Sequence, residues 1–476
     1  MRGAIPGKAF RQHARLCAFA LLSFASFRIW AQNEPPGIDA FLDAAAYDDA
    51  RRNAAIEALE SGWRDAYAGM LVDLADIVSR TRSLNTRTFS SPRRVLSLLG
   101  RLTGQDFGND LDAWRHWVWR QPYEPHPAYA AFKGQLYGRL DQRFTVFFRP
   151  PAAAIIRLDE IQWGGVGVNG IPPLEYPQHV RAEDAGYLQD SNRIFGLVID
   201  GEARAYPQRI LAWHELALER FDATEVALVY CTLCGTVIPY DARVGGELRK
   251  FGTSGLLYRS NKLMFDFETG SLWSSLTGEP VVGPLAGQGL RLDAMPVVTT
   301  TWGEWRALHP DTLVLSIETG HQRDYSEGAA YRTYFGTDEL MFDVRRTDGR
   351  LRNKAEVLVV REAGSLGAPD DAHEPLAIDI DYLQKNPVYH FTYNGRRLVV
   401  VTSDDGANRV YAAGDRTFVG TAAETGLFDQ TGRAWSVTED SLEAGFDPRL
   451  RLPRVPAHRA FWFGWFAQHP QTRLIR

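Results

Sequence analysis

Two cysteines, Cys231 and Cys234, are the residues of this 476-residue chain best placed to do chemistry. The only other cysteine is Cys17. Because they lie three residues apart and are followed by Gly235, their thiols can share one metal ion or one disulfide. Apolar residues flank them on both sides, so we expect two strands joined by a tight turn at residues 231–235, the cysteine turn. Gly235 is expected to take a positive φ in this turn.

A metal site is the first interpretation of the cysteine turn, with copper or zinc as the metal. A Cys-x-x-Cys-Gly turn between strands is a half-site of rubredoxin-like and zinc-ribbon centres, and thiolates with imidazole suit Cu(I) and Zn(II). The sequence lacks a second cysteine pair, so the other ligands would be histidine or carboxylate. His214 is the candidate third ligand, on a helix predicted from Gln208 to Arg220. The alternative for His214 is a structural histidine that is hydrogen-bonded beneath the sheet.

Two further interpretations of Cys231 and Cys234 stay open. A redox dithiol is the first, although thioredoxin-type motifs lie at a helix N-terminus whereas residues 236–240 are predicted to be strand. A structural disulfide is the second, although so small a loop adds little chain-entropy stabilisation. The corresponding functions are metal binding or metal-assisted redox chemistry, thiol–disulfide oxidoreductase activity, and a cell-envelope interaction protein. The sequence does not establish whether the protein is an enzyme.

The N-terminus predicts export. Basic residues precede an apolar run from Leu16 to Phe27, and Ala31 follows as a small residue at a cleavage site. This is the pattern of a signal peptide over residues 1–31, with a mature periplasmic or secreted chain that begins near Gln32. The alternative is a membrane anchor, but the run is short for a span. No later segment is long and apolar enough, so the mature chain is expected to have no membrane span. A net charge of −5 without a Lys/Arg block argues against nucleic-acid binding.

Residues 37–148 are predicted to form a helical module. Apolar residues recur at intervals of three and four from Ile56 to Ile77, and Asp110 is placed to cap a later helix. The segment LTGQDFGNDLDAWRHWV is similar to one often seen in bacterial HEAT-type repeat proteins, and an unrelated bundle is the alternative. We expect this HEAT-like module to pack or to dock an unknown protein partner.

The rest of the chain is predicted to be β-rich and duplicated. The motif at residues 269–274 returns at 431–436, and the Trp-rich motif at 302–312 returns at 462–472, in the same order. These repeats predict two related units, residues 164–316 and 354–476. Thr402 and Asp405 stand in the second unit where the cysteines stand in the first. The predicted fold is therefore α+β, a helical module followed by two duplicated β-rich units.

Several motifs around the cysteine turn are similar to a bacterial exported family that is catalogued as a domain of unknown function, number 3179. The resemblance covers roughly residue 164 to the C-terminus and supplies no activity. The matching stretches are Asp200–Glu215, Val229–Thr236, Phe251–Ser274, Leu276–Gly287 and Thr300–Ser316. The family commonly has proline where this chain has Thr232. Polar and aromatic members of these motifs and of the segment that follows them are candidates to line a pocket, and their alternative is structural support: Arg204, Asp266, Trp273, Arg323 and Tyr325.

Overall fold

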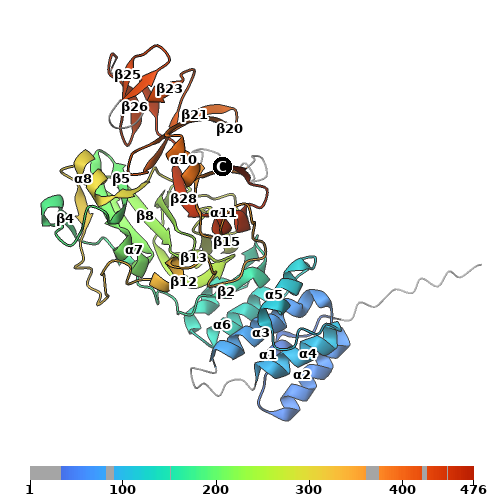
Figure 1. The fold of residues 1–476 in the computed structure, drawn as a ribbon. Coiled ribbons are helices and arrows are strands. Elements are labelled where there is room, and N and C mark those ends of the chain that lie inside the picture. Colours follow the sequence, from blue (N-terminus) through green and yellow to red (C-terminus); the bar gives the residue numbers. More distant parts are fainter. Residues whose placement is uncertain (1–33, 82–90, 151, 361–374, 421–425, 448) are drawn as a thin grey trace, which may run out of the picture.

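The computed structural model describes residues 34–81, 91–150, 152–360, 375–420, 426–447 and 449–476. The predicted signal peptide lies outside these residues. A helical region comes first and is followed by a larger β-rich part, as predicted (Figure 1). Within the described ranges, no helix has the length and apolar character that crossing a bilayer requires.

The helical region is organised around a buried helix, α3, which contacts most of the other helices. Its neighbours begin and end where local signals place them: Pro92 opens α4, Gly104 closes it at φ 70°, and the Asp110 carboxylate caps α5 by accepting from Ala113 N at 2.9 Å. The likeness to HEAT repeats stays a prediction. The helices are α1 Ile38–Asp43, α2 Asp49–Gly62, α3 Ala68–Thr81, α4 Pro92–Thr103, α5 Leu111–Arg120 and α6 Tyr129–Gly138.

The first β-rich unit contains three main sheets and carries the cysteine turn. A six-stranded sheet has the order β1-β15-β14-β13-β12-β2, a four-stranded one β3-β7-β8-β9, and a five-stranded one β16-β5-β6-β17-β4. The strands are β1 Ala153–Ala154, β2 Ile161–Trp163, β3 Leu174–Glu175, β4 His179–Arg181, β5 Arg193–Ile199, β6 Glu202–Pro207, β7 Leu216–Phe221, β8 Thr224–Cys231, β9 Thr236–Asp241, β12 Phe251–Tyr258, β13 Asn261–Asp266, β14 Leu272–Ser274, β15 Pro280–Gly283, β16 Val298–Thr301 and β17 Leu313–Leu315. The hairpin β10 Arg243–Val244 and β11 Glu247–Leu248 and the helices α7 Gln208–His214 and α8 Trp302–Leu308 complete it, and α9 Arg332–Phe335 lies in the segment between the two units.

Among its described residues the second unit also has three sheets, with the orders β28-β18-β19-β29, β20-β21-β22 and β23-β24-β25-β26-β27. Its helices are α10 Ile380–Lys385 and α11 Trp462–Gln468. Its strands are β18 Glu356–Val360, β19 Leu376–Asp379, β20 Val388–Tyr393, β21 Arg396–Thr402, β22 Asn408–Ala412, β23 Phe418–Gly420, β24 Leu427–Asp429, β25 Ala434–Val437, β26 Ser441–Ala444, β27 Arg451–Pro453, β28 Ala457–Phe461 and β29 Arg473–Ile475.

The two units share an order of elements. The run β16-β5-β6-β17 in the first unit corresponds to β28-β18-β19-β29 in the second, with two antiparallel pairs followed by one parallel pair in each. In the sequence, a helix also lies between the first and last strands of each run: α8 in the first unit and α11 in the second. These correspondences support the predicted duplication, which itself stays a prediction.

One predicted element is wrong. The helix expected from Gln208 to Arg220 ends at His214, and Leu216–Phe221 forms β7 instead. The helix ends because Glu215 takes a left-handed conformation, with φ 59° and ψ −7°. The next residues then pair with β8 from Thr224 to Val229, so the chain reaches the cysteine turn through a strand and not directly from a helix.

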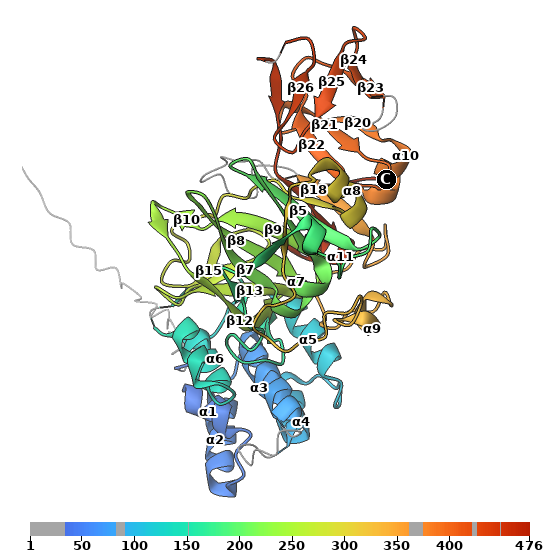
Figure 2. The ribbon, with the colours of Figure 1, turned by 90° about the vertical axis from the view of Figure 1, so that its left-hand side faces the viewer.

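The second unit packs against the strands that carry the cysteine turn (Figure 2). One hydrophobic cluster joins Val229 of β8 and Ile238 of β9 to Val357, Ala460 and Trp462 of the second unit. Since burial of apolar surface is the main stabilising contribution to folding, this cluster holds the two units together. The cysteine turn therefore lies at the boundary between the units.

Gly196 provides a test of the packing between β5 and α8. A Cβ atom at this position would overlap the indole ring of the fully buried Trp305. We expect Gly196→Ala to lower the free energy of unfolding by about 1–3 kcal/mol, the usual cost of overpacking, measured by chemical denaturation. Gly186→Ala is the matched control, because nothing lies within 4 Å of its Cβ position. Equal stability of the two variants would contradict the packing described.

Candidate dithiol site

The cysteine turn has the predicted form. Cys231 ends β8, Thr236 begins β9, and Gly235 takes a φ of 59°. Cys234 N donates a hydrogen bond to Cys231 O at 3.2 Å and closes the turn. Both cysteines are free and approach each other to 3.0 Å. Two unbonded thiols therefore lie side by side at the end of a buried hairpin.

A second hairpin places polar groups against the sulfurs. Cys234 Sγ donates to the carbonyl of Ser260 at 3.3 Å and accepts from the side-chain amide of Asn261 at 3.4 Å. Ser260 and Arg259 form the two-residue turn between β12 and β13, and both have positive φ, 62° and 49°. Such turns usually contain Asn-Gly because other residues are strained there. The strained backbone conformation of Ser260 thus directs its carbonyl toward the thiols.

A buried ion pair lies beside the same turn. Lys262 Nζ donates to the backbone carbonyls of Glu215 and, at 3.3 Å, of Tyr230, and lies 3.8 Å from the Glu215 carboxylate. That carboxylate accepts from Thr232 Oγ1 at 2.5 Å and from the Tyr331 hydroxyl at 3.2 Å. Lys262 and Glu215 are only 4% and 7% exposed. Their mutual pairing offsets the cost of burying two charges next to the cysteines.

The two thiols differ in acidity. Burial opposes ionisation of Cys231, but hydrogen bonds from the Cys234 side chain and the Lys262 backbone outweigh it and lower the pKa of Cys231. Burial and the adjacent Cys231 raise the pKa of Cys234 well above its usual value. Burial lowers the pKa of Lys262, and the carboxylate and both sulfurs act in the opposite direction. One sulfur is therefore prepared to be a thiolate and the other to keep its proton.

His214 lies elsewhere, in a hydrogen-bonded chain beside a surface pocket. Its Nδ1 contacts the Pro172 carbonyl at 2.8 Å, and its Nε2 contacts the Tyr325 hydroxyl at 2.5 Å. Burial lowers the pKa of His214 to about 4, so the ring is neutral. Because a carbonyl only accepts, Nδ1 carries the proton and Nε2 accepts from Tyr325. Tyr325 in turn lies 2.6 Å from Thr319 Oγ1.

The structure brings the two cysteines together without His214. Over all the residues described, no group of three or more His, Cys, Asp or Glu side chains has the arrangement to hold a metal ion. Both ring nitrogens of His214 have the partners expected of a structural histidine, from a backbone carbonyl and a phenol.

The five predicted pocket residues separate into two groups. Arg204 binds Glu202, Glu219 and the backbone of residue 220, and links β6 to β7. Asp266 accepts from Thr269 and from Trp273 Nε1 at 2.8 Å, which supports a turn. Asp429 makes the same contacts with Thr431 and Trp435 in the second unit. The contacts of Arg204, Asp266 and Trp273 therefore support the fold.

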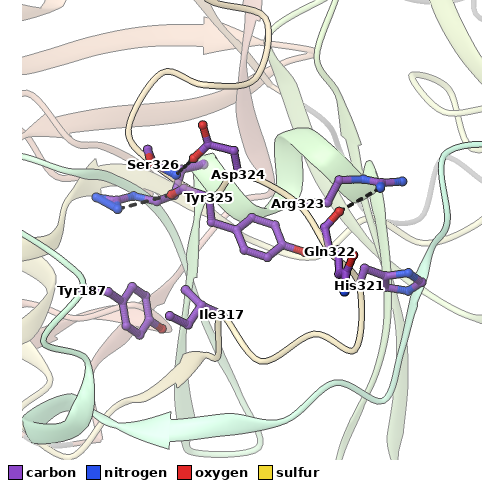
Figure 3. Close-up of a pocket in the computed structure, with 9 residues that line it drawn as sticks. Tyr187, Ile317, His321, Gln322, Arg323, Asp324, Tyr325 and Ser326 are labelled. Carbon is purple, nitrogen blue, oxygen red and sulfur yellow. Dashed lines mark hydrogen bonds between the residues drawn. The ribbon is translucent and has the colours of Figure 1, made fainter.

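Arg323 and Tyr325, in contrast, line a surface pocket of about 740 Å³ (Figure 3). The ring of Tyr325 extends across this pocket from the loop at residues 321–326. The pocket also contains Tyr187, Arg209 and His321. Arg323 and Tyr325 thus line a surface pocket whose lining does not include the cysteines.

Two segments cover the cysteine turn. In α11 of the second unit, Gly464 lies so close that a Cβ there would be 3.4 Å from Cys234 Sγ, and Phe461 N donates to the Cys234 carbonyl at 2.7 Å. In α9, the Tyr334 hydroxyl donates to the Leu233 carbonyl at 2.7 Å. The cysteines are 3% and 1% exposed as a result. The second unit and the segment between the two units therefore close the site to bulk solvent.

Sequence reasoning missed Lys262, Glu215, Asn261 and Tyr331. Lys262 carries a signal that is visible in the sequence, because it is a charged residue directly before the apolar residues 263–265 of the buried strand β13. Glu215 follows the predicted ligand His214 directly. Because Glu215 has a left-handed conformation, its side chain, and not that of His214, faces the cysteine turn. Tyr331 has no such signal, because it reaches the site from a loop more than a hundred residues away.

Comparison with known proteins gives one family. The family model described as "Protein of unknown function (DUF3179)" matches residues 168–472. The chain belongs to this family, and the helical region precedes the matched part. No curated protein and no solved structure matches the chain.

Burial of neutral His214 makes stability depend on pH. The pKa of His214 falls from 6.5 to about 4 on folding, so below pH 6.5 the unfolded chain takes up a proton that the folded chain does not. Stability is present above the unfolded pKa and is lost as pH falls toward the folded one. We expect His214→Gln to lose less unfolding free energy between these two pH values than the wild type, measured by denaturant titration. An unchanged slope in His214→Gln would contradict the assignment.

Proposed function

We propose that the cysteine turn is a redox-active dithiol and that the protein is a thiol–disulfide oxidoreductase. The observation that carries this proposal is the pair of free thiols 3.0 Å apart, one made acidic and one kept protonated. Thiol–disulfide exchange needs this asymmetry, because a thiolate attacks and a second thiol resolves the mixed disulfide. Cys231 is the attacking residue and Cys234 the resolving one.

The surroundings of the sulfurs support the chemistry. The positive charge of Lys262 favours a thiolate at Cys231, and Ser260 O holds the Cys234 thiol. Residues in left-handed conformations are frequent at functional sites, where the fold compensates their strain. Glu215, Ser260 and Tyr331, with φ of 59°, 62° and 56°, all meet the turn or its ion pair. A turn that served only to carry a disulfide would not need this strained polar shell.

Export is part of the proposal. The charged and apolar pattern of residues 1–31 predicts a periplasmic or secreted protein, where cysteines are exposed to oxidants. Burial under α9 and α11 then slows non-specific oxidation of the two thiols. The helical module remains a candidate for docking a protein partner.

The redox proposal predicts a reversible two-electron transition. The protein is equilibrated with mixtures of reduced and oxidised dithiothreitol, or of reduced and oxidised glutathione. Its free thiols are then alkylated, and the fraction of reduced protein is measured by mass spectrometry. We expect a potential above roughly −300 mV, since structural disulfides lie below that value. Reduced protein should be alkylated first at Cys231, and Cys231→Ser should abolish the transition. A pair that stays oxidised across this range is a structural disulfide, and a pair that never oxidises has no redox role.

Metal binding by Cys231 and Cys234 is the second candidate function, and two adjacent buried thiols favour it. Soft thiolates select Cu(I) among the transition metals. A zinc site requires three or four protein ligands, and the described residues supply only the two sulfurs, so zinc fits poorly. Copper bound here would supply metal-assisted redox chemistry, with Cys231 and Cys234 as its ligands.

The copper candidate has a direct test. Reduced protein is incubated with Cu(I) under anaerobic conditions, and bound metal is counted after gel filtration. A two-sulfur site predicts one equivalent of bound copper, which should be lost in Cys231→Ser and in Cys234→Ser. His214→Gln should keep this copper, because His214 has other partners. Loss of copper in His214→Gln would instead restore the three-ligand site predicted from the sequence. Wild-type protein without bound copper would end the metal candidate.

A further inference from the structure

A partner protein cannot reach the buried sulfurs without displacing the elements that cover them. Tyr334 of α9 and Phe461, next to α11, hydrogen-bond directly to the backbone of the cysteine turn. An approaching protein disulfide would have to break both contacts. Attack on a disulfide also requires an in-line approach to one of its sulfur atoms. A small molecule that enters through an existing cavity avoids this cost.

Three neighbouring cavities share lining residues, and the innermost reaches the cysteine turn at Leu233. An inner cavity of about 60 Å³ is lined by Leu233 of the turn and by Glu215, Lys262 and Tyr331. A larger one of about 630 Å³ shares Tyr331 with it, along with the apolar residues 166 and 171. The larger cavity shares residues 322–324 with the 740 Å³ surface pocket of Figure 3. The inner cavity has room for a few water molecules or for the reactive end of a small ligand.

Tyr331 separates the inner cavity from the outer one. It has the left-handed φ of 56°, which is an outlier for a bulky residue. Its hydroxyl bonds to Glu215 at 3.2 Å, and its ring is part of the wall of both cavities. A rotation of this side chain would join the cavities at the cost of one hydrogen bond. Tyr331 is therefore in the position of a gate.

The outer part of the path favours an anionic group. Arg323 borders both outer cavities, lies 5.8 Å from the ring of Trp213, and bonds to a neighbouring backbone carbonyl. No ion pair of Arg323 occurs among the residues described. The Asp324 carboxylate, which borders the same cavities, accepts from Ser326 N at 2.9 Å. A guanidinium without a carboxylate partner is a natural binding group for a carboxylate of a ligand.

We propose that the substrate of the dithiol is a small disulfide that bears a carboxylate, which Arg323 binds while the disulfide passes Tyr331. This inference rests on the proposed redox function. The Cys231 thiolate attacks one sulfur of the substrate, the substrate S–S bond breaks, and one small thiolate leaves. Cys234 then gives its proton to that thiolate and attacks Cys231 Sγ, which releases the second small thiolate. The substrate gains two electrons, and the protein keeps an intramolecular disulfide.

The test compares three oxidants of reduced protein, with rates followed by mass spectrometry. Glutathione disulfide is small and anionic, 2-hydroxyethyl disulfide is small and neutral, and oxidised thioredoxin is a protein. We expect glutathione disulfide to react fastest and thioredoxin slowest. Arg323→Gln should slow only the glutathione disulfide reaction, by about fivefold, as expected for one exposed ion pair. Arg243→Gln, at an exposed arginine of β10, is the matched control and should change nothing.

The gate is tested separately with Tyr331→Phe. This variant keeps the ring and removes the hydroxyl that bonds to Glu215, so both small disulfides should react faster while the ratio between their rates is unchanged. Thioredoxin that reacts as fast as the small disulfides would overturn the substrate class. Equal rates for the two small disulfides, unaffected by Arg323→Gln, would overturn the role of Arg323. If none of the oxidants reacts with folded protein although all react with denatured protein, the redox function itself fails.

Discussion

The burial of four ionisable groups around one turn is the constraint on which the rest of this structure depends. Cys231, Cys234, Glu215 and Lys262 are each less than a tenth exposed. A buried charge is tolerated only where it is paired and hydrogen-bonded, so each group here fixes the position of the next. These contacts fix the positions of the end of α7, the β8–β9 turn and β13 relative to one another. The loop that carries Tyr331 is added to them by its bond to the Glu215 carboxylate.

Backbone strain follows from the same constraint. Glu215 has to leave the helix in a left-handed conformation so that its carbonyl faces Lys262 while its carboxylate faces Thr232. Ser260 has to take a positive φ so that its carbonyl faces Cys234. Such conformations cost roughly 1–3 kcal/mol each and persist where the surroundings compensate them. The well-packed sheets on both sides provide that compensation, which ties the stability of the fold to the geometry of the site.

The sequence predicted the parts of the fold that depend on local signals. The cysteine turn needs only its flanking apolar runs and Gly235, and the helices need only Pro92, Gly104 and Asp110. The predicted helix to Arg220 failed because the apolar residues at 216–218 suit either a helix or a strand, and pairing with β8 decides between them.

Of the site, the sequence predicted the sulfurs but not their partners. Lys262 reaches Glu215 across 47 residues, and Tyr331 reaches it across 116. No local pattern specifies contacts of that range. His214 lies one residue from Glu215, and the left-handed turn at Glu215 determines that the carboxylate faces the cysteines while the imidazole faces Tyr325. Residue spacing identified the segment that lies beside the turn, and the role of His214 as a metal ligand stays a prediction.

The second unit contains a turn at the place where the predicted duplication puts the counterpart of the cysteine turn. In this β21–β22 turn, Thr402 is buried and accepts from Asn408 Nδ2 at 3.0 Å, while Gly406 supplies a φ of 85°. Backbone bonds and one side-chain pair form this turn without cysteines. The second unit also covers the cysteines of the first: the absence of a side chain at Gly464 is what lets α11 lie against Cys234. One unit thus holds the two cysteines and the other covers them, while among the described cavities the one that reaches the turn does so at Leu233, beside Tyr331.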